Sequence, residues 1–207
     1  MRLEDFEPAQ PGRGEVLVRV RAAAVNPMDA GIRGGRLQIM TGRKFPRALG
    51  HDFPGVVEAI GEGVTRVRVG DEVLGGASIK GAGAFAEMVL AEEKGIAKKP
   101  ANISWEEGAA LPTPAVTAYQ ALVNKGKLKA GQSVFVAAAL GRSAVQLALM
   151  MGASVGGSCR GTVVQEAHDL GVSPIVEFDF DPAKLAGRFD VVLDASGKLP
   201  LNRRRRW

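Results

Sequence analysis

The chain has 207 residues, of which 46% are hydrophobic and 24% charged, a composition that excludes disordered and collagen-like proteins. Its longest apolar run is seven residues, Val134 to Leu140, far short of the ~20 that cross a bilayer, and the first ten residues lack the apolar core of a secretory signal. The net charge is +5, but Arg203–Arg206 supply four of the 27 basic residues, so 23 basic residues face 22 acidic ones elsewhere and no nucleic-acid-binding face is expected.

The first half of the chain is predicted to form short β-strands separated by glycine-rich turns. Glu15–Arg21 alternates valines with other residues at the period of a half-buried strand. Similar strands are expected at Gly55–Ile60, Val64–Val69 and Phe85–Leu90. Short strands with frequent glycine turns predict a small barrel-like β domain.

The pattern changes near residue 104. Ser104 and Glu107 have the spacing of a capping box, which predicts the start of a helical region that reaches Leu122. From Ser133 onward, strands are expected at Val134–Val136, Ala153–Gly157, Pro174–Phe178 and Phe189–Asp194, and helices at Gly141–Met151 and Thr162–Leu170. This alternation predicts a right-handed, doubly wound α/β domain with a short, four-stranded parallel sheet.

Several sequence blocks follow one another in a fixed order. They are Gly14–Ala24 with Val25-Asn26-Pro27-Met28-Asp29, Leu49–Val57, Gly70–Val73, Gly83–Glu87, Leu111–Leu122, Gln146–Ala148 and Phe189–Asp194. Over roughly residues 14–200 the chain resembles the medium-chain dehydrogenase/reductase superfamily, and within it the zinc-free, zeta-crystallin-like quinone oxidoreductases. The resemblance implies a GroES-like β-barrel domain over residues 1–115, a partial Rossmann domain (a doubly wound parallel sheet) that binds NADP over residues 116–207, and an active site between them.

The chain departs from this family pattern in three places. It begins at Met1, where the family usually has an earlier strand, so the GroES-like domain is expected to be incomplete at its N-terminus. Past Pro200 the family continues with further Rossmann strands, but here Leu201–Trp207 follows, so a truncated chain is expected in which the family homodimer is doubtful. The loop between Val136 and Ala144 is shorter than the family's and holds a single glycine.

That loop is the candidate pyrophosphate site. Ala139, Gly141 and Ala144 keep the spacing of a G-x-G-x-x-G/A fingerprint, with alanine in place of the first glycine. Arg142 and Ser143 lie at the predicted helix start, where backbone amides can hold phosphate. The alternative is a strand-to-helix turn that is merely packed with alanine.

The end of the next predicted strand favours NADP over NAD. Gly157–Thr162 contains no acid for the ribose hydroxyls. Arg160 can pair with a 2′-phosphate, and Ser158 and Thr162 can donate hydrogen bonds to it. Cys159 lies between them in this candidate cofactor-binding segment. The alternative for Arg160 is a solvated turn residue.

The chain has too few ligands for the zinc site of the related alcohol dehydrogenases. A catalytic zinc needs three protein ligands, typically drawn from Cys and His. The chain has one cysteine, Cys159, and two histidines, and the stretch Thr113–Thr117 lacks the second cysteine of the zinc branch. His51 stands where the zinc branch carries a ligand, and Asn26 stands in the region of its first cysteine. We therefore expect no metal, with His51 hydrogen-bonded near Asp52. His168 is expected at the surface. The single cysteine excludes an internal disulfide and fits a reducing, cytoplasmic compartment.

The resemblance also implies catalytic residues. Asn26, Asp29 and Thr117 match the family's site, with Thr117 also approaching the cofactor and Asp194 and Gly197 in the turn beside it. The expected function is an NADPH-dependent oxidoreductase that transfers hydride to a small-molecule quinone or activated enone without zinc, with neither nucleic acid nor membrane as partner.

Other readings remain open. The structural alternative for Asn26 is an Asn-Pro turn. For the whole chain, one alternative is a truncated or degenerate relative with weak or no catalysis that acts as a nucleotide-binding or structural protein. Another is an enoyl-reductase domain from a larger synthase.

Overall fold

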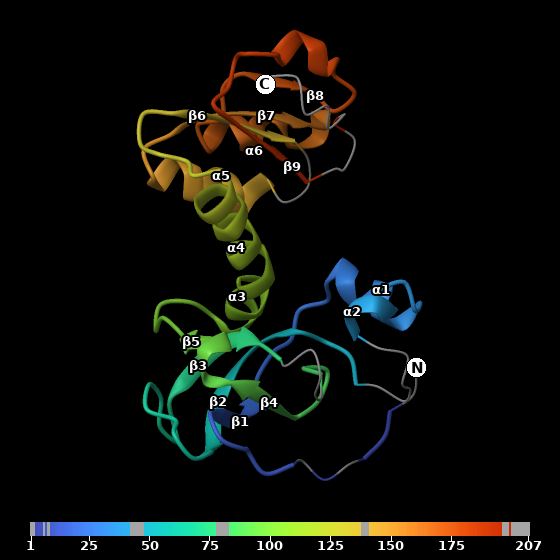
Figure 1. Cartoon of the computed structure of the whole chain (residues 1–207), viewed down its shortest axis with the longest axis vertical. Helices are drawn as coiled ribbons and strands as arrows, with labels where there is room; N and C mark the ends of the chain where they lie inside the picture. The colour runs from blue at the N-terminus through green and yellow to red at the C-terminus, as the bar shows by residue number, and fades with distance from the viewer. Residues whose placement is uncertain are drawn as a thin grey trace. The chain divides into compact units, whose positions relative to one another are not determined.

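The computed structural model describes residues 3–5, 7, 9–41, 48–77, 83–137, 141–195 and 199. The chain forms two compact units, Met1–Thr113 and Pro114–Trp207 (Figure 1). The division falls two residues before the boundary expected from the sequence. None of the helices in the described ranges combines the length and the hydropathy that a membrane span requires.

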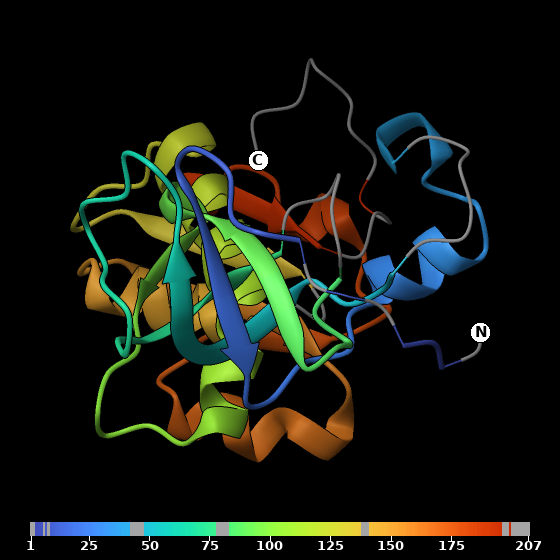
Figure 2. The same ribbon diagram turned by 90° about the horizontal axis from the view of Figure 1, so that it is seen from below.

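The first unit is built on a five-stranded antiparallel sheet with strand order β4-β1-β2-β3-β5. Its strands are β1 (Glu15–Val20), β2 (Asp52–Ile60), β3 (Glu72–Gly76), β4 (Met88–Glu92) and β5 (Ile96–Lys98). Figure 2 shows β1, in blue, beside its partner β4, in green. Val16 and Val18 of β1 are fully buried in one apolar core with Phe53 of β2. The strand predicted at Glu15–Arg21 is therefore confirmed, whereas the one predicted at Phe85–Leu90 begins only at Met88.

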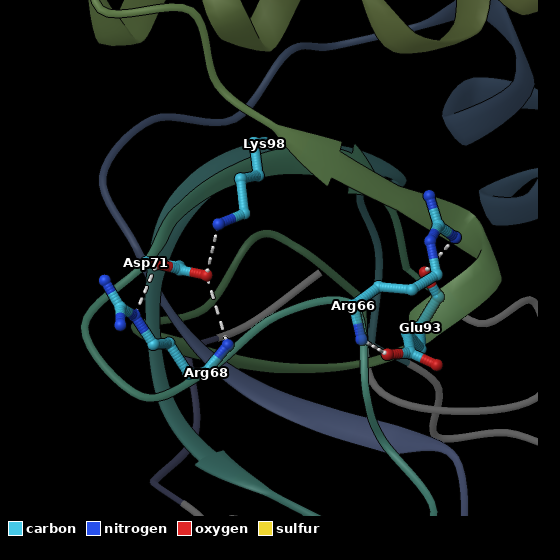
Figure 3. A network of polar contacts seen from close by, with 5 residues as sticks. All are labelled: Arg66, Arg68, Asp71, Glu93 and Lys98. Carbon is cyan, nitrogen blue, oxygen red and sulfur yellow. Dashed lines mark hydrogen bonds and ion pairs between the residues drawn. The ribbon is translucent and has the colours of Figure 1, made fainter.

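The segment Val64–Val69, predicted as a strand, is a loop instead. Glu93, in the short 3-10 turn η1 (Glu93–Gly95), accepts the backbone N–H of Thr65 at 2.7 Å and that of Arg66 (Figure 3). These two bonds also lower the pKa of Glu93 from its ordinary value, the Arg66 bond more than the Thr65 bond. Because the amides donate to a side chain, they do not join a strand ladder. The strand predicted at Val64–Val69 was therefore wrong.

A second carboxylate holds the far end of this loop. Asp71 accepts the backbone N–H of Arg68 at 3.1 Å and forms an ion pair with Lys98 of β5 at 3.0 Å (Figure 3). The hydrogen bond from Lys98, followed by the backbone bond from Arg68, lowers the pKa of Asp71. Two acidic side chains therefore fasten one loop to the sheet.

The described helices of the first unit are short. They are α1 (Pro27–Arg33), α2 (Gln38–Thr41) and α3 (Trp105–Ala110), and α4 (Pro112–Tyr119) follows across the division and continues as the π-helical segment η2 (Gln120–Lys125). The predicted capping box is present, since Glu107 donates its N–H to Ser104 Oγ at 3.1 Å and Ser104 donates its N–H to Glu107 Oε2 at 2.8 Å. It fixes the start of α3 at Trp105.

The second unit is a parallel sheet of four described strands in the order β8-β7-β6-β9. The strands are β6 (Ser133–Ala137), β7 (Ser154–Cys159), β8 (Ile175–Glu177) and β9 (Val191–Asp194). Between them lie α5 (Gly141–Met150), the 3-10 turn η3 (Gly161–Val163), α6 (Val164–Asp169) and the 3-10 turn η4 (Pro182–Leu185). The helix predicted at Thr162–Leu170 is therefore a 3-10 turn followed by a shorter α-helix.

Apolar clusters cover both faces of this sheet. On one face Val134 and Val136 of β6 pack with Ala148 of α5. On the other face Phe135 packs with Phe189, the ring centroids 5.2 Å apart. A strand that is buried on both sides needs an uninterrupted apolar sequence, which is the pattern that predicted it.

Candidate functional site

A cavity of about 600 Å³ opens at the carboxyl ends of the parallel strands in the second unit. Ser158 and Cys159 at the end of β7, Arg160 after it, and Gly141 and Arg142 at the start of α5 all line this cavity. Ligands of doubly wound α/β domains lie at this edge of the sheet. Five residues that the sequence indicated for cofactor binding are thus brought together.

Arg160 is oriented by an aromatic ring. Its guanidinium lies over the ring of Phe178, with 5.2 Å from Cζ to the ring centroid, and both residues line the cavity. A guanidinium on an aromatic face keeps its charge and its hydrogen-bond donors. Phe178 has no sequence signature of a binding role, and its contact with Arg160 joins the ends of two different strands.

Arg142 and Glu166 form an ion pair between α5 and α6. Both side chains are well exposed and both residues line the cavity. An exposed ion pair contributes little to stability, about 0–1 kcal/mol. Arg142 can therefore leave Glu166 for an anionic ligand at small cost.

The thiol of Cys159 is held in its neutral form. Burial, and then the charge of Glu177 on the neighbouring strand β8, raise the pKa of Cys159 from its ordinary value. A thiol with a raised pKa is a poor nucleophile because the thiolate is the reactive form. Cys159 is thus suited to lining the cavity rather than to covalent chemistry.

Other predicted cofactor residues have different places. Ser143 is half-buried on α5 and does not line the cavity. Asp194 ends β9 and its Oδ2 accepts the backbone N–H of Leu199 at 3.0 Å, while its neighbour Ala195 lines the cavity. Thr117 is half-buried on α4, within the second unit. Two further predictions, Ala139 and Gly197, lie outside the described residues.

The first unit holds a polar cluster around Asn26. The Asn26 backbone N–H donates to Asp29 Oδ2 at 2.7 Å, and Asn26 Nδ2 donates to Asp52 Oδ2 at 3.1 Å. Thr113 donates to Asp52 twice, from its backbone N–H at 3.0 Å and from its hydroxyl at 2.7 Å. Asp29 and Asp52 are both buried. The structure therefore connects the predicted catalytic residues Asn26 and Asp29 with Asp52 and Thr113. The bonds between Asp52 and Thr113 were not predicted from the sequence.

Asn26 also has a structural role at the start of a helix. It is the N-cap residue of α1, with extended backbone angles, and Pro27 is the first residue of the helix. The Asn26 N–H bonds to Asp29 Oδ2, as in a capping box, and the side-chain amide donates to Asp52.

The two histidines differ in environment. The ring of His51 packs against Gly76 of β3, where no side chain could be accommodated, and the hydrogen bond expected for it near Asp52 is not made within the described ranges. His168 is exposed on α6. Across the described part of the chain, no three His, Cys, Asp or Glu side chains gather as a metal-binding group.

Comparison with known proteins agrees with this architecture. The model of the alcohol dehydrogenase GroES-like domain matches residues 12–101. A chloroplast envelope quinone oxidoreductase homolog of Arabidopsis thaliana is 34% identical over 176 residues, which are 81% of this chain and 54% of that protein. The chloroplastic NADPH-dependent alkenal/one oxidoreductase of the same species is 34% identical over 195 residues, 88% of this chain and 50% of that protein.

Solved structures give the same result. An alcohol dehydrogenase superfamily protein from Novosphingobium aromaticivorans has a TM-score of 0.83 and 32% identity, over 91% of this chain and 60% of that chain. The chain belongs to the medium-chain dehydrogenase/reductase superfamily. Its first unit is the GroES-like part of this fold and its second unit a Rossmann-type sheet. The chain spans about half the length of the curated superfamily members it matches.

Proposed function

We propose that this superfamily member binds NADPH in the second unit and directs hydride to a quinone or an activated enone. The cavity at the ends of β6 and β7 carries the proposal, because five residues indicated for the cofactor line it. The names of two similar proteins, a quinone oxidoreductase homolog and an NADPH-dependent alkenal/one oxidoreductase, support the same chemistry.

Open space at a helix start, hydrogen-bond donors and apolar walls support the assignment of the cavity to a dinucleotide. A Cβ at Gly141 would meet no atom within 4 Å, so the start of α5 faces open space where backbone amides can meet the pyrophosphate. Aliphatic side chains form much of the wall, among them Val136, Val145, Leu170, Val172 and Ile175. Such a wall is suited to the apolar faces of a nucleotide base.

Arg160 supports a preference for the phosphorylated cofactor. The end of β7 carries no acid that would repel a 2′-phosphate, and the Arg160 guanidinium is held at the cavity by Phe178. Ser158 and Thr162 also line the cavity and can donate hydroxyl hydrogen bonds. We assign these three side chains to the 2′-phosphate.

We further propose that the reaction proceeds without zinc. Asn26 stands in the region of the first cysteine of the zinc branch and the stretch Thr113–Thr117 lacks the second, so the thiolate ligands of that site are missing. Bound NADPH supplies the hydride. A quinone or an enone delocalises the negative charge that the hydride brings and takes its proton from water, so the products are the hydroquinone or saturated ketone and NADP⁺. The residues of the chain then mainly position the acceptor, and Asn26 is assigned to this task.

The proposal is tested by following NADPH absorbance with the purified chain and either 1,4-naphthoquinone or methyl vinyl ketone. We expect NADPH oxidation that depends on the protein and on the acceptor and falls in Asn26→Ala. Saturable NADPH binding with no turnover on either acceptor would support the non-catalytic alternative. Absence of NADPH binding would contradict the assignment of the cavity.

A further inference from the structure

A buried carboxylate lies at the centre of the Asn26 cluster. Asp52, the first residue of β2, is fully buried. Its Oδ2 accepts hydrogen bonds from the backbone N–H of Thr113 at 3.0 Å and from Asn26 Nδ2 at 3.1 Å, and its Oδ1 accepts the Thr113 hydroxyl at 2.7 Å. Burying a charged or polar group is costly unless hydrogen bonds compensate for it. These bonds therefore tie Asp52 to both of its partners.

The same carboxylate oxygen binds the Thr113 main chain and the Asn26 amide. A backbone N–H can only donate, so Asp52 Oδ2 accepts the Thr113 bond. It also accepts from Asn26 Nδ2, so the NH₂ of Asn26 and not its carbonyl faces this oxygen. Oδ1 of Asn26 is consequently turned away from Asp52, and the amide keeps one N–H for another partner.

The main chain beside Asn26 is restrained as well. Asp29 Oδ2 accepts the Asn26 N–H at 2.7 Å, and the Asn26 carbonyl accepts the Asp29 N–H at 3.0 Å. The Ala24 N–H donates to the Asp52 carbonyl at 3.2 Å. Asn26 is half-buried, so part of this restrained residue is accessible to a ligand.

We propose that Asp52 is a positioning residue that fixes which atoms of the Asn26 amide face the substrate. This inference rests on the proposed function, in which Asn26 positions the acceptor. Asp52 is fully buried and acts through Asn26. A pre-oriented amide needs no reorganisation when a ligand binds, which is how positioned dipoles assist a reaction.

The claim that Asp52 holds the Asn26 amide is tested by NMR of the Asn26 side-chain NH₂ in the whole chain without cofactor. The resonance is assigned by its loss in Asn26→Ala. A hydrogen bond to a carboxylate is worth about 1.5–3 kcal/mol, so in Asp52→Ala the Nδ2 protons should exchange with water about tenfold faster or more. Thr113→Val is the matched control, because it removes the hydroxyl bond and leaves the backbone bond to Oδ2. We expect its Asn26 exchange to stay within about twofold of wild type.

Conservative variants keep this test decisive. In Asp52→Asn the new NH₂ can donate to the Thr113 hydroxyl while the amide oxygen still accepts from Asn26, so slow exchange should be restored. Asp52→Ser, with a shorter side chain, replaces Asp52→Ala if that variant does not fold. Unchanged Asn26 exchange in the folded Ala or Ser variant would overturn the proposal.

The functional half is tested by NADPH-dependent turnover. Asp52→Ala and Asn26→Ala should each lower kcat about tenfold. The double variant should be no slower than either single variant, because each substitution abolishes the same oriented amide. Ser104→Ala, which removes a hydrogen bond elsewhere in the first unit, is the stability control and should keep the wild-type kcat. The Kd for NADPH should be unchanged in all of these variants.

Two outcomes separate this inference from the proposed function. Additive losses, or a wild-type kcat in Asp52→Ala, would overturn the positioning role while hydride transfer stands. A wild-type chain that binds NADPH but reduces no acceptor would overturn the proposed function and with it the role toward substrate. The NMR experiment would then still decide the orientation of the amide.

Discussion

At the scale of single residues, the proposed preference for NADPH depends on Arg160. Its guanidinium is held over Phe178 at the cavity, and a charged hydrogen bond to a phosphate is worth about 1.5–3 kcal/mol. Arg160→Ala should therefore weaken NADPH binding about tenfold or more and leave NADH binding nearly unchanged. Calorimetric titration of both cofactors measures the two effects.

Arg142→Ala is the matched control for this prediction. Arg142 lines the same cavity but lies at the start of α5, where both cofactors would place their pyrophosphate. Its loss should weaken NADPH and NADH alike. Equal losses for both cofactors in Arg160→Ala would mean that Arg160 does not meet the 2′-phosphate.

Single residues also show where sequence reasoning ends. Asn26 and Asp29 could be indicated because they stand three positions apart in one family block. The bond between Asp52 and Thr113 joins residues 61 positions apart and depends on how α4 approaches β2. Nothing local in either segment encodes that approach, so the partner of Asn26 had to come from the structure.

At the scale of elements, the capping box at α3 is a local stabilising device. Replacing Ser104 removes the acceptor for the Glu107 N–H, and loss of an N-cap costs about 1 kcal/mol. Ser104→Ala should lower the Tm by roughly 2–4 °C. Asn102→Ala, at an exposed position just before the helix, should change it little. A Tm in Ser104→Ala equal to that of the control would contradict a stabilising cap.

The loop held by Glu93 and Asp71 should depend on pH. Both carboxyl groups have pKa values below their ordinary ones, 4.5 for Glu93 and 3.8 for Asp71. A lowered folded-state pKa stabilises the fold at pH values above the ordinary pKa, and this stabilisation is lost as pH falls through the folded-state value. Between neutral pH and strongly acidic pH, the amides of Thr65 and Arg66 should therefore lose their protection.

Hydrogen–deuterium exchange across this loop, corrected for the intrinsic effect of pH, checks the prediction. Glu93→Gln should already show weak protection at neutral pH and little further change on acidification. Protection in the wild type that is constant down to pH values well below 4 would show that the carboxylates do not hold the loop.

The elements differ in how far their sequence determined them. The capping box was predictable because both partners lie within one helical turn. The strands β6 and β9 were predictable because burial on both faces requires a continuous apolar run. The loop at Val64–Val69 was not predictable, because the amides of Thr65 and Arg66 bond to Oε1 of Glu93, which lies 28 and 27 positions away in the sequence.

At the scale of the whole molecule, the ordered family blocks were enough to predict a β unit followed by a parallel α/β unit. The short strands with glycine turns indicated the β unit, and the alternating strands and helices after residue 133 indicated the α/β unit. The cavity required the structure, because its lining comes from the ends of several strands and helices at once. Phe178 and Glu166 entered the site only through those contacts.

The metal content is a property of the whole chain. Because the chain lacks the cysteine ligands of the zinc branch, the purified and dialysed protein should contain far less than one zinc per chain by elemental analysis. Removal of metal with a chelator should also leave NADPH-dependent turnover unchanged, since no Lewis acid is assigned to the reaction. Stoichiometric zinc that survives dialysis would contradict the zinc-free chemistry.

Equilibrium titration of the whole chain with NADPH and with NADH tests the central claim most directly. The account predicts saturable binding of one NADPH per chain, with a Kd about tenfold or more below that for NADH, because the 2′-phosphate adds a charged contact with Arg160. No saturable binding of either cofactor, or tighter binding of NADH, would contradict it.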